Sequence, residues 1–344
     1  MNILQKHFPM IRAREELLKI IEQTPALLGV YRQWEEKEQQ EFLDFCTGVR
    51  GVKLLYDSFF KEIMNPEYVP DRVNDFLSLL LQQKVKVLAV LPNDSTRIAD
   101  EKSLLVTDLV IELEDGSIAN LEVQKIGYRF PGERSACYSA DLLLRQYKRI
   151  RGQQGKKFSY TDIKTVYTIV LFEQSPEPFK HFPQEYLHYF EAKSNTGLEL
   201  NLIQKYLFVP LDIFKKIRHD KGINGKLEAW LIFLGSDEPE DIVQLITQYP
   251  EFKAAYEEVY NLCLNTEKVM GIFSEELKLL DQNTVQLMID EMQQEIDGYK
   301  QTITEQDQAM AEKDKAMIEK DKTITAQADR IDELEKLLAQ STDK

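Results

Sequence analysis

Two strand-like runs joined by a Glu-Asp-Gly turn lie near the middle of the chain, at residues 104–113 and 118–123. Short runs rich in β-branched and aliphatic residues, with a glycine-containing turn between them, are typical of paired antiparallel strands. The turn supplies Gly116 at the place where a common three-residue hairpin loop requires a left-handed backbone. The sequence therefore predicts a β-hairpin, and any fold of this chain has to include it.

Acidic and amide side chains share one face of the predicted hairpin. Successive side chains of a strand point to opposite faces, so Asp108 lies on the face opposite to Leu109. In the second strand, Glu122 and Gln124 lie on the face opposite to Leu121. Direct pairing of Asp108 with Glu122 requires a loop with an odd number of residues, and the three turn residues supply it.

Two carboxylates at this spacing repel each other unless a cation lies between them. Oxygen ligands favour Mg²⁺ or Mn²⁺, and such a metal lowers the pKa of a bound water and stabilises charge on an attacked phosphate. Asp108 and Glu122 are therefore predicted metal ligands, and the Gln124 amide could orient the water. The alternative is that Asp108 and Glu122 are ordinary solvated residues on an open strand face.

The spacing of apolar residues predicts further elements on both sides of the hairpin. Helices are expected in two segments of residues 1–50, at 52–64, 73–81 and 139–151, and in several pieces of 226–290. Strands are expected at 85–91, at 165–172 and as a pair within 198–209. Residues 165–172 are almost continuously apolar, which predicts a strand buried on both faces. Residues 179–190 are expected to be a loop or short helix, with His181 and His188 in surface or packing roles because no nucleophile motif accompanies them.

Charge and cysteine content limit the class of protein. The net charge of −15 at pH 7 argues against a protein that coats nucleic acid indiscriminately. Cys46, Cys137 and Cys263 stand far apart, which predicts reduced thiols in a cytoplasmic protein and argues against a zinc site. The longest apolar runs are far short of a membrane span, and the first residues carry no apolar signal segment, so no membrane partner is expected.

A basic segment follows the hairpin in this otherwise acidic chain. Residues 125–164 hold 10 Lys and Arg against 3 Asp and Glu. Helical spacing places Arg145, Lys148 and Arg149 on one face. The predicted DNA contacts continue with Arg151, Lys156 and Lys157. Such a cluster binds phosphates whatever the global charge, with an affinity that falls steeply with salt. The alternative is a charged, solvated helix.

A seven-residue repeat begins at residue 289, with apolar residues at positions 289, 296, 303, 310, 317, 324, 331 and 338. A strict heptad predicts a long helix that forms a coiled coil, either in a homo-oligomer or on another partner. The second apolar seam is poor, because Gln306, Lys313, Lys320 and Gln327 occupy it before Leu334 restores it. Self-association is therefore expected to be weak. The alternative is a solvated single helix held by Glu–Lys pairs.

The order and spacing of these residues resemble the PD-(D/E)XK nuclease family transposases, which include the recombination-promoting nucleases. The family pattern begins with an Asp-x-x-Phe-Lys helix, which Asp57 to Lys61 fit. It continues with an acid-bearing strand, an acid-Gly turn and Asn-x-Glu-x-Gln, as in residues 108–124, and then with Arg134, Tyr138 and Gln146. The resemblance covers about residues 52–175.

The resemblance implies a metal-dependent nuclease site on the hairpin. Its catalytic residues would be Asp108, Glu122, Gln124 and Asp57, with Mg²⁺ or Mn²⁺ as cofactor and DNA as substrate. A third metal ligand would come from Asp57 or Glu62 on the early helix. Gln124 stands where many such enzymes have lysine, and its amide brings no positive charge to the site.

Three residues after the hairpin have two interpretations. Arg134 would join the predicted DNA contacts. Arg134, Tyr138 and Gln146 equally suit a role in the core, where they would support the site without touching DNA.

Together, the resemblance and the periodicity predict an α/β fold of restriction-endonuclease-like architecture, with a central mixed sheet flanked by helices. The expected segments are an N-terminal helical segment, 1–50, a nuclease-like domain, 51–225, a helical region, 226–288, and a coiled-coil tail, 289–344. The predicted function is a Mg²⁺-dependent DNA endonuclease of the transposase or recombination-promoting type, which hydrolyses phosphodiester bonds. The alternative is a catalytically weak DNA-binding or scaffolding protein that oligomerises through its coiled coil.

Overall fold

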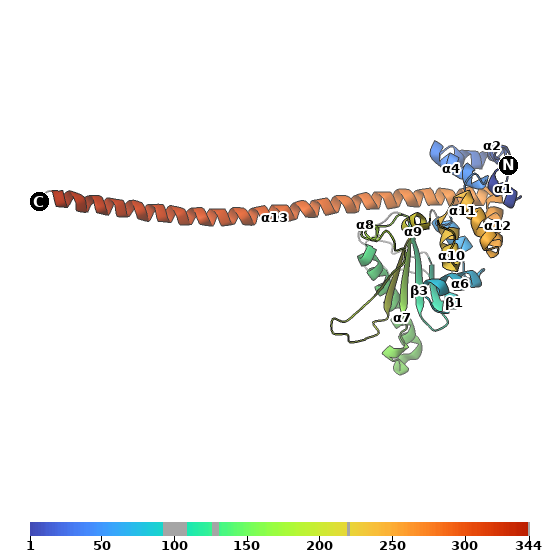
Figure 1. The fold of residues 1–344 in the computed structure, drawn as a ribbon, viewed down its shortest axis with the longest axis horizontal. Helices are drawn as coiled ribbons and strands as arrows, with labels where there is room; N and C mark the ends of the chain where they lie inside the picture. Colours follow the sequence, from blue (N-terminus) through green and yellow to red (C-terminus); the bar gives the residue numbers. More distant parts are fainter. Residues whose placement is uncertain (92–108, 126–130, 219–220, 343–344) are drawn as a thin grey trace. The chain divides into compact units, whose positions relative to one another are not determined.

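The computed structural model of the chain describes residues 1–91, 109–125, 131–218 and 221–342 (Figure 1). At a few of these positions only the backbone is described, namely residues 57, 282–287, 290, 291, 294, 332 and 336–342. The chain divides into two compact units, Met1–Thr284 and Val285–Lys344.

A mixed sheet lies at the centre of the first unit (Figure 1). Its strands are β1 (Val87–Val90), β2 (Leu109–Leu113), β3 (Ile118–Gln124), β4 (Val166–Phe172), β5 (His188–Glu191) and β6 (Gln204–Pro210). They lie side by side in the order β1-β2-β3-β4-β6-β5. The pairs β3–β4 and β4–β6 are parallel and the other pairs are antiparallel. The predicted central mixed sheet is therefore confirmed.

Helices surround this sheet and form most of the rest of the chain. Before β1 lie α1 (Ile3–His7), α2 (Arg14–Gln23), α3 (Pro25–Tyr31), α4 (Glu36–Cys46), α5 (Asp57–Ile63) and α6 (Pro70–Leu80). Between the later strands lie α7 (Pro131–Gln154) and α8 (Glu177–Lys180), with short 3₁₀ turns at Gly155–Lys157 and Tyr160–Asp162. After β6 come α9 (Leu211–Arg218), α10 (Lys226–Gly235), α11 (Pro239–Gln248), α12 (Glu251–Leu264) and α13 (Thr266–Thr342).

Both faces of the sheet are covered. On one face, Ile111 and Leu121 belong to the main hydrophobic core. On the other face, Val110 and Val166 pack against Leu142 of α7, and this helix runs alongside the sheet in Figure 1. Strand β4 is buried over almost its whole length, so the prediction of a strand buried on both faces is confirmed.

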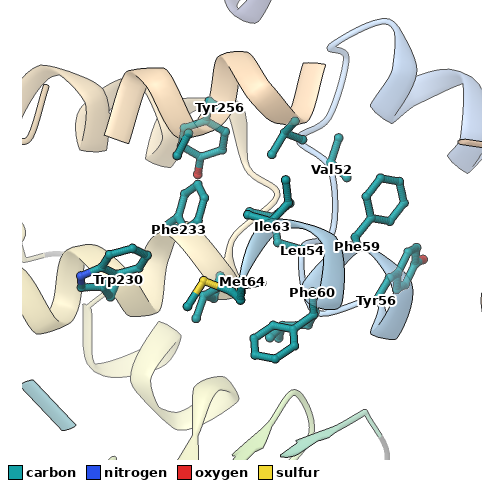
Figure 2. Packing of buried hydrophobic residues seen from close by; sticks show 14 of the residues in the cluster. Val52, Leu54, Tyr56, Phe59, Phe60, Ile63, Met64, Trp230, Phe233 and Tyr256 are labelled. Carbon is teal, nitrogen blue, oxygen red and sulfur yellow. The ribbon is translucent and has the colours of Figure 1, made fainter. Parts of the chain in front are cut away.

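One continuous hydrophobic core extends from Leu4 in α1 to Phe273 in the first turns of α13. Figure 2 shows the part of this core that joins α5, α10 and α12, where the rings of Phe233 and Tyr256 lie 5.0 Å apart between centroids. Helices from before and after the sheet therefore stabilise the same fold, because burial of their apolar faces is shared. The domain boundaries that the sequence predicts at residues 50 and 225 stay predictions.

The helix predicted at residues 52–64 is shorter than expected. α5 begins at Asp57, and the preceding Val52 and Leu54 are buried in an irregular segment. The backbone nitrogen of Gly51 donates a hydrogen bond of 2.7 Å to the carbonyl oxygen of Asp237. This contact with a distant segment holds the chain in an irregular course before α5, so the apolar residues there pack into the core without forming a helical turn.

The strand pair predicted within residues 198–209 is wrong in its first half. β6 begins at Gln204, and the alternating Leu198, Leu200 and Leu202 lie in an irregular connection where each is more than half exposed. Alternation suits a strand, but a strand also needs a partner for its backbone groups. The neighbouring β5 was not predicted, because three of its four residues, 188–190, lie in the segment expected to be loop or short helix. The short helix α8 begins at Glu177 and overlaps only the first two residues of that segment, where it fits the expectation.

The seven-residue repeat lies on a helix, as predicted. α13 is 77 residues long, and the described heptad positions from Ile289 to Ile331 are between 48% and 63% exposed. This stripe of apolar side chains is therefore open to solvent along the second unit. Among the described residues, no helix has the length and apolar character that a membrane span requires.

Candidate active site

The predicted hairpin forms with the predicted register. Leu109 pairs with Leu121 and Val110 pairs with Asn120, so the numbers of paired residues sum to 230 as expected. The loop has three residues, and Gly116 has a φ of +84°, in the left-handed region. The backbone nitrogen of Gly116 donates a hydrogen bond of 2.8 Å to the carbonyl oxygen of Leu113. The local sequence was therefore sufficient to fix this turn and its register.

Glu122 and Gln124 contact each other at the C-terminal end of β3. The side-chain amide nitrogen of Gln124 donates a hydrogen bond of 2.8 Å to Glu122 Oε1. Both residues are buried, with Glu122 only 2% exposed and Gln124 only 3%, and Arg134 of α7 lies beside Glu122. The structure thus brings the two residues together as expected. The alternative of a solvated Glu122 on an open strand face is wrong, because α7 covers that face.

The carboxyl group of Glu122 is buried away from solvent. Burial raises the pKa of the Glu122 carboxyl, and the nearby Arg134 guanidinium and the Gln124 amide act in the opposite direction. Arg134 Nε lies 3.6 Å from Glu122 Oε1. A carboxylate in such a place is stabilised by any further positive charge that reaches it.

Several oxygen atoms at this place have no hydrogen-bond partner among the described residues, namely Glu122 Oε2, Gln124 Oε1 and the side-chain oxygen of Asn120. An unpaired buried polar atom costs about 1–3 kcal/mol, so the arrangement favours an additional ligand. Hard cations such as Mg²⁺ and Mn²⁺ prefer oxygen ligands, and this donor set fits one. The described part of the chain contains no group of three or more His, Cys, Asp or Glu side chains that could hold a metal, so it provides only part of a ligand set.

For the other predicted metal ligands, Asp108, Asp57 and Glu62, the structure gives less information. Asp108 lies outside the described residues. Asp57 is the first residue of α5, and only its backbone is described. Glu62, the alternative to Asp57, accepts a hydrogen bond of 2.6 Å from Lys268 Nζ in an exposed ion pair. The third metal ligand therefore stays a prediction.

A buried charged pair lies directly beyond the Glu-x-Gln sequence. Lys125 forms an ion pair with Glu276 of α13, and the two side chains are only 9% and 1% exposed. The Lys125 ammonium also lies over the ring of Tyr56, 3.9 Å from its centroid. These contacts join the end of β3 to the residue before α5 and to α13. Sequence reasoning did not find them, since nothing in the local pattern links Lys125 to a residue 151 positions later.

Gln146 has a structural role at the opposite end of the hairpin. It is buried, its side-chain oxygen accepts a hydrogen bond of 2.7 Å from the backbone nitrogen of Lys164, and its amide nitrogen donates to the carbonyl oxygen of Gly116 at 3.4 Å. These bonds hold the turn of the hairpin against α7. Tyr138 is also buried, with the Arg134 guanidinium 5.1 Å from its ring centroid.

Two of the predicted DNA-binding residues are engaged with acids of the domain. Both guanidinium ends of Arg149 donate to Glu112 of β2, at 2.7 and 2.9 Å. Arg145 forms an ion pair with Asp141 one turn earlier in α7. The positive charge of these two residues is therefore balanced within the fold, whereas the predicted contacts Lys148, Arg151, Lys156 and Lys157 are exposed.

The basic end of α7 lies away from Glu122. Arg134, in the first turns of α7, contacts Glu122, while Gln146 contacts Gly116 in the turn before β3. Twelve helical residues separate these two contacts, which corresponds to about 18 Å along the helix axis. The exposed basic residues after Gln146 lie beyond that distance, at the turn end of the hairpin.

A mixed sheet between helical layers, with a buried Glu-x-Gln at the end of a central strand, defines an α/β protein of restriction-endonuclease-like architecture. Residues 54–288 match the family model described as PD-(D/E)XK nuclease family transposase. Since this match spans well over half of the 344 residues, the chain belongs to that family. Membership supports a function of the nuclease or transposase type and implies DNA as substrate. No curated protein and no solved structure matched the chain.

Proposed function

We propose that the protein is an endonuclease that hydrolyses phosphodiester bonds of DNA with the help of Mg²⁺ or Mn²⁺. The main support is the set of buried, unpartnered oxygens around Glu122 and Gln124 in a chain of nuclease-family membership. A site of oxygen donors that is incomplete by itself favours a cation over a purely structural role.

Glu122 Oε2 would hold the cation together with Asp108, the residue that precedes β2. When bound, the metal would supply an activated water and a positive charge for the attacked phosphate. Gln124 would orient the water through its amide oxygen while its nitrogen keeps Glu122 Oε1 in place. Asp57 stays a proposed additional ligand.

Arg134 is the proposed contact to the phosphate near the site. It already lies beside Glu122, and about a third of its side chain is exposed. A guanidinium donates paired hydrogen bonds that match phosphate oxygens. Many enzymes of this kind have a lysine where this chain has Gln124, which carries no charge. Arg134 of α7 would then supply the positive charge that this lysine brings.

The exposed basic residues Lys148, Arg151, Lys156 and Lys157 are proposed to bind the same DNA farther along. Their distance from Glu122 exceeds about 18 Å along α7, which corresponds to roughly five or more base pairs of duplex at 3.4 Å per base pair. Arg145 and Arg149 would contribute less, because Asp141 and Glu112 already balance their charges.

The exposed heptad stripe of α13 is proposed to join two copies of the chain. Apolar side chains that repeat every seven residues gain stability when a second helix covers them. Lysines and glutamines on the second seam would keep this association weak. The three cysteines, Cys46, Cys137 and Cys263, are free thiols, and a cytoplasmic location is proposed on that basis.

Nicking of supercoiled plasmid DNA tests the proposal. The full chain should nick the plasmid with Mg²⁺ or Mn²⁺ and stop when a chelator is added, and Asp108→Asn and Glu122→Gln should both be inactive. Glu114→Gln is the matched control, because this glutamate lies in the turn of the same hairpin and its side chain is 64% exposed. DNA binding without nicking by any of these proteins would instead favour the catalytically weak binding or scaffolding protein.

A further inference from the structure

An aromatic cleft opens between the start of α7, the α8 segment and the edge of the sheet formed by β5 and β6. Its volume is about 520 Å³, and its walls include Phe179, Phe182, His188, Phe190 and Phe208. The rings contact one another, with Phe179 lying 5.1 Å from His188 and 5.6 Å from Phe208 between centroids. Phe182 and Phe190 are 55% and 52% exposed, so flat apolar surfaces are accessible from solvent.

The cleft also contains a polar atom that points to a particular kind of ligand. Nε2 of His188 is buried and has no hydrogen-bond partner in the described part of the chain. A purely hydrocarbon ligand would leave this nitrogen unpaired, whereas a flat ring with polar atoms on its edge would pair with it once the imidazole turns toward the cleft, while the ring stacks on the phenylalanines. A nucleobase has both properties.

The cleft lies on the same face of the sheet as Glu122. Strand pairing places Glu122 opposite Val170, Val170 opposite Phe208, and Phe208 opposite His188. Directly paired residues point to the same face, and strands are about 4.8 Å apart, so Phe208 lies about 10 Å from Glu122 and His188 about 14 Å. This separation is on the scale of one or two nucleotides.

The charges around the cleft are compatible with a nucleic-acid strand. Gly132 and Ala136, which line the cleft, belong to the same first turns of α7 as Arg134, whose guanidinium lies beside Glu122. A strand that runs from Glu122 into the cleft would therefore start at the Arg134 guanidinium. The acid on the rim, Glu191, forms an ion pair with Lys205 at 3.8 Å, which reduces its repulsion of phosphates.

We propose that this cleft binds an unpaired base of the DNA substrate, one or two nucleotides from the phosphate that is cleaved. The inference rests on the proposed nuclease function, and it deepens that function by specifying the substrate class: DNA with unpaired or easily extruded bases at the cleavage site. Bases that are mismatched or already single-stranded cost least to place in such a pocket.

Binding of short labelled oligonucleotides to the full chain, with a chelator present to prevent cleavage, tests this proposal. The probes are a single strand, the same strand with one abasic nucleotide at successive positions, and a blunt duplex. Phe182→Ala/Phe190→Ala should weaken single-strand binding by about 5- to 150-fold, the range expected for loss of one stacked base, and leave duplex binding unchanged. Phe182→Tyr/Phe190→Tyr should retain binding, because the rings remain. Tyr68→Ala removes a ring elsewhere that is even more exposed, at 79%, and is the matched control.

An abasic nucleotide at one position should weaken binding to the parent protein and have no further effect on the double alanine variant. Equal affinity for abasic and intact strands, equal loss for duplex and single strand, or no binding of single strands would overturn the cleft as a base site. Plasmid nicking separates this inference from the proposed function. Nicking without any base-dependent binding refutes the cleft alone, and base-dependent binding without nicking refutes the nuclease activity alone.

Discussion

Replacing Glu276 with leucine would remove the carboxylate that pairs with the ammonium group of Lys125 at the end of β3. Both side chains are nearly inaccessible to solvent, at 9% and 1% exposed, so water cannot take over the role of the carboxylate. Breaking a buried ion pair by removing one partner costs about 3–5 kcal/mol. The ring of Tyr56, 3.9 Å from the Lys125 ammonium, still attracts the charge, which favours the lower end of that range.

A loss of about 3 kcal/mol corresponds to a fall in Tm of about 6–12 °C, at about 2–4 °C per kcal/mol for a large domain. Thermal and urea unfolding of the full chain, followed by circular dichroism, would measure it. Glu275→Leu is the matched control, since Glu275 precedes Glu276 in α13 but is exposed. The double variant Lys125→Met/Glu276→Leu should recover most of the loss, because two apolar side chains replace the pair and leave no uncompensated charge.

The same variants test whether the pair also positions the site. Lys125 follows Gln124 directly, so Glu276→Leu should slow plasmid nicking at temperatures where the protein is still folded. The reasoning is refuted if Glu276→Leu unfolds within a degree or two of Glu275→Leu, or if the double variant is no more stable than the single one.

Further predictions concern the site, the hairpin, the basic end of α7 and the tail. Burial holds the pKa of Glu122 above its unfolded value of about 4.3, so its ionisation costs stability, a cost that is absent below the unfolded pKa and complete above the folded one. Glu122→Gln should therefore raise Tm at pH 7 and remove stabilisation by Mg²⁺, and equal Tm values for parent and variant at pH 7 would contradict this. Gly116→Ala should lower stability by about 1–2 kcal/mol in urea unfolding, because the φ of +84° is unfavourable for a residue with a Cβ; a neutral effect would argue against the turn geometry. Lys156→Ala/Lys157→Ala should leave Tm unchanged and weaken binding to all DNA sequences, with the salt slope reduced by about 0.9 for each phosphate that is no longer neutralised; an unchanged slope would mean that these lysines are only solvated. Truncation after Met292 should leave the unit of residues 1–284 folded and reduce self-association, measured by light scattering as the number of chains per particle. The same number of chains per particle for the full and truncated proteins would refute the role of the tail.

The sequence by itself determined the features that depend on neighbours along the chain. Alternation and the three-residue turn predicted the register of β2 and β3, because side-chain direction in a strand has a period of two and Gly116 relieves the strain of a left-handed turn. The same local rule placed Glu122 and Gln124 on one face. The continuous apolar run at β4 and the heptads of α13 were also predicted correctly, since burial on both faces and a helical repeat each produce a pattern in consecutive residues.

Local patterns were less reliable where distant contacts compete with them. The apolar spacing at residues 52–56 suits a helix, yet the bond from Gly51 to Asp237 keeps this segment irregular. The alternating leucines of residues 198–202 suit a strand, yet no partner strand reaches them in the described sheet. In both places the free energy of an element depends on a partner far away in sequence, which periodicity does not contain.

Only the tertiary structure decided what surrounds the site. Alternation assigns Glu122 to a face, but α7 makes that face a buried one and brings Arg134 beside the carboxylate. Helical spacing groups Arg145 with Arg149, but their acid partners show that part of the basic cluster is already balanced. No pattern in the sequence around Lys125 or Glu276 indicates the ion pair between them. The electrostatic environment of a residue is set by whatever packs against it in three dimensions, and residues far apart in the sequence supply most of those neighbours.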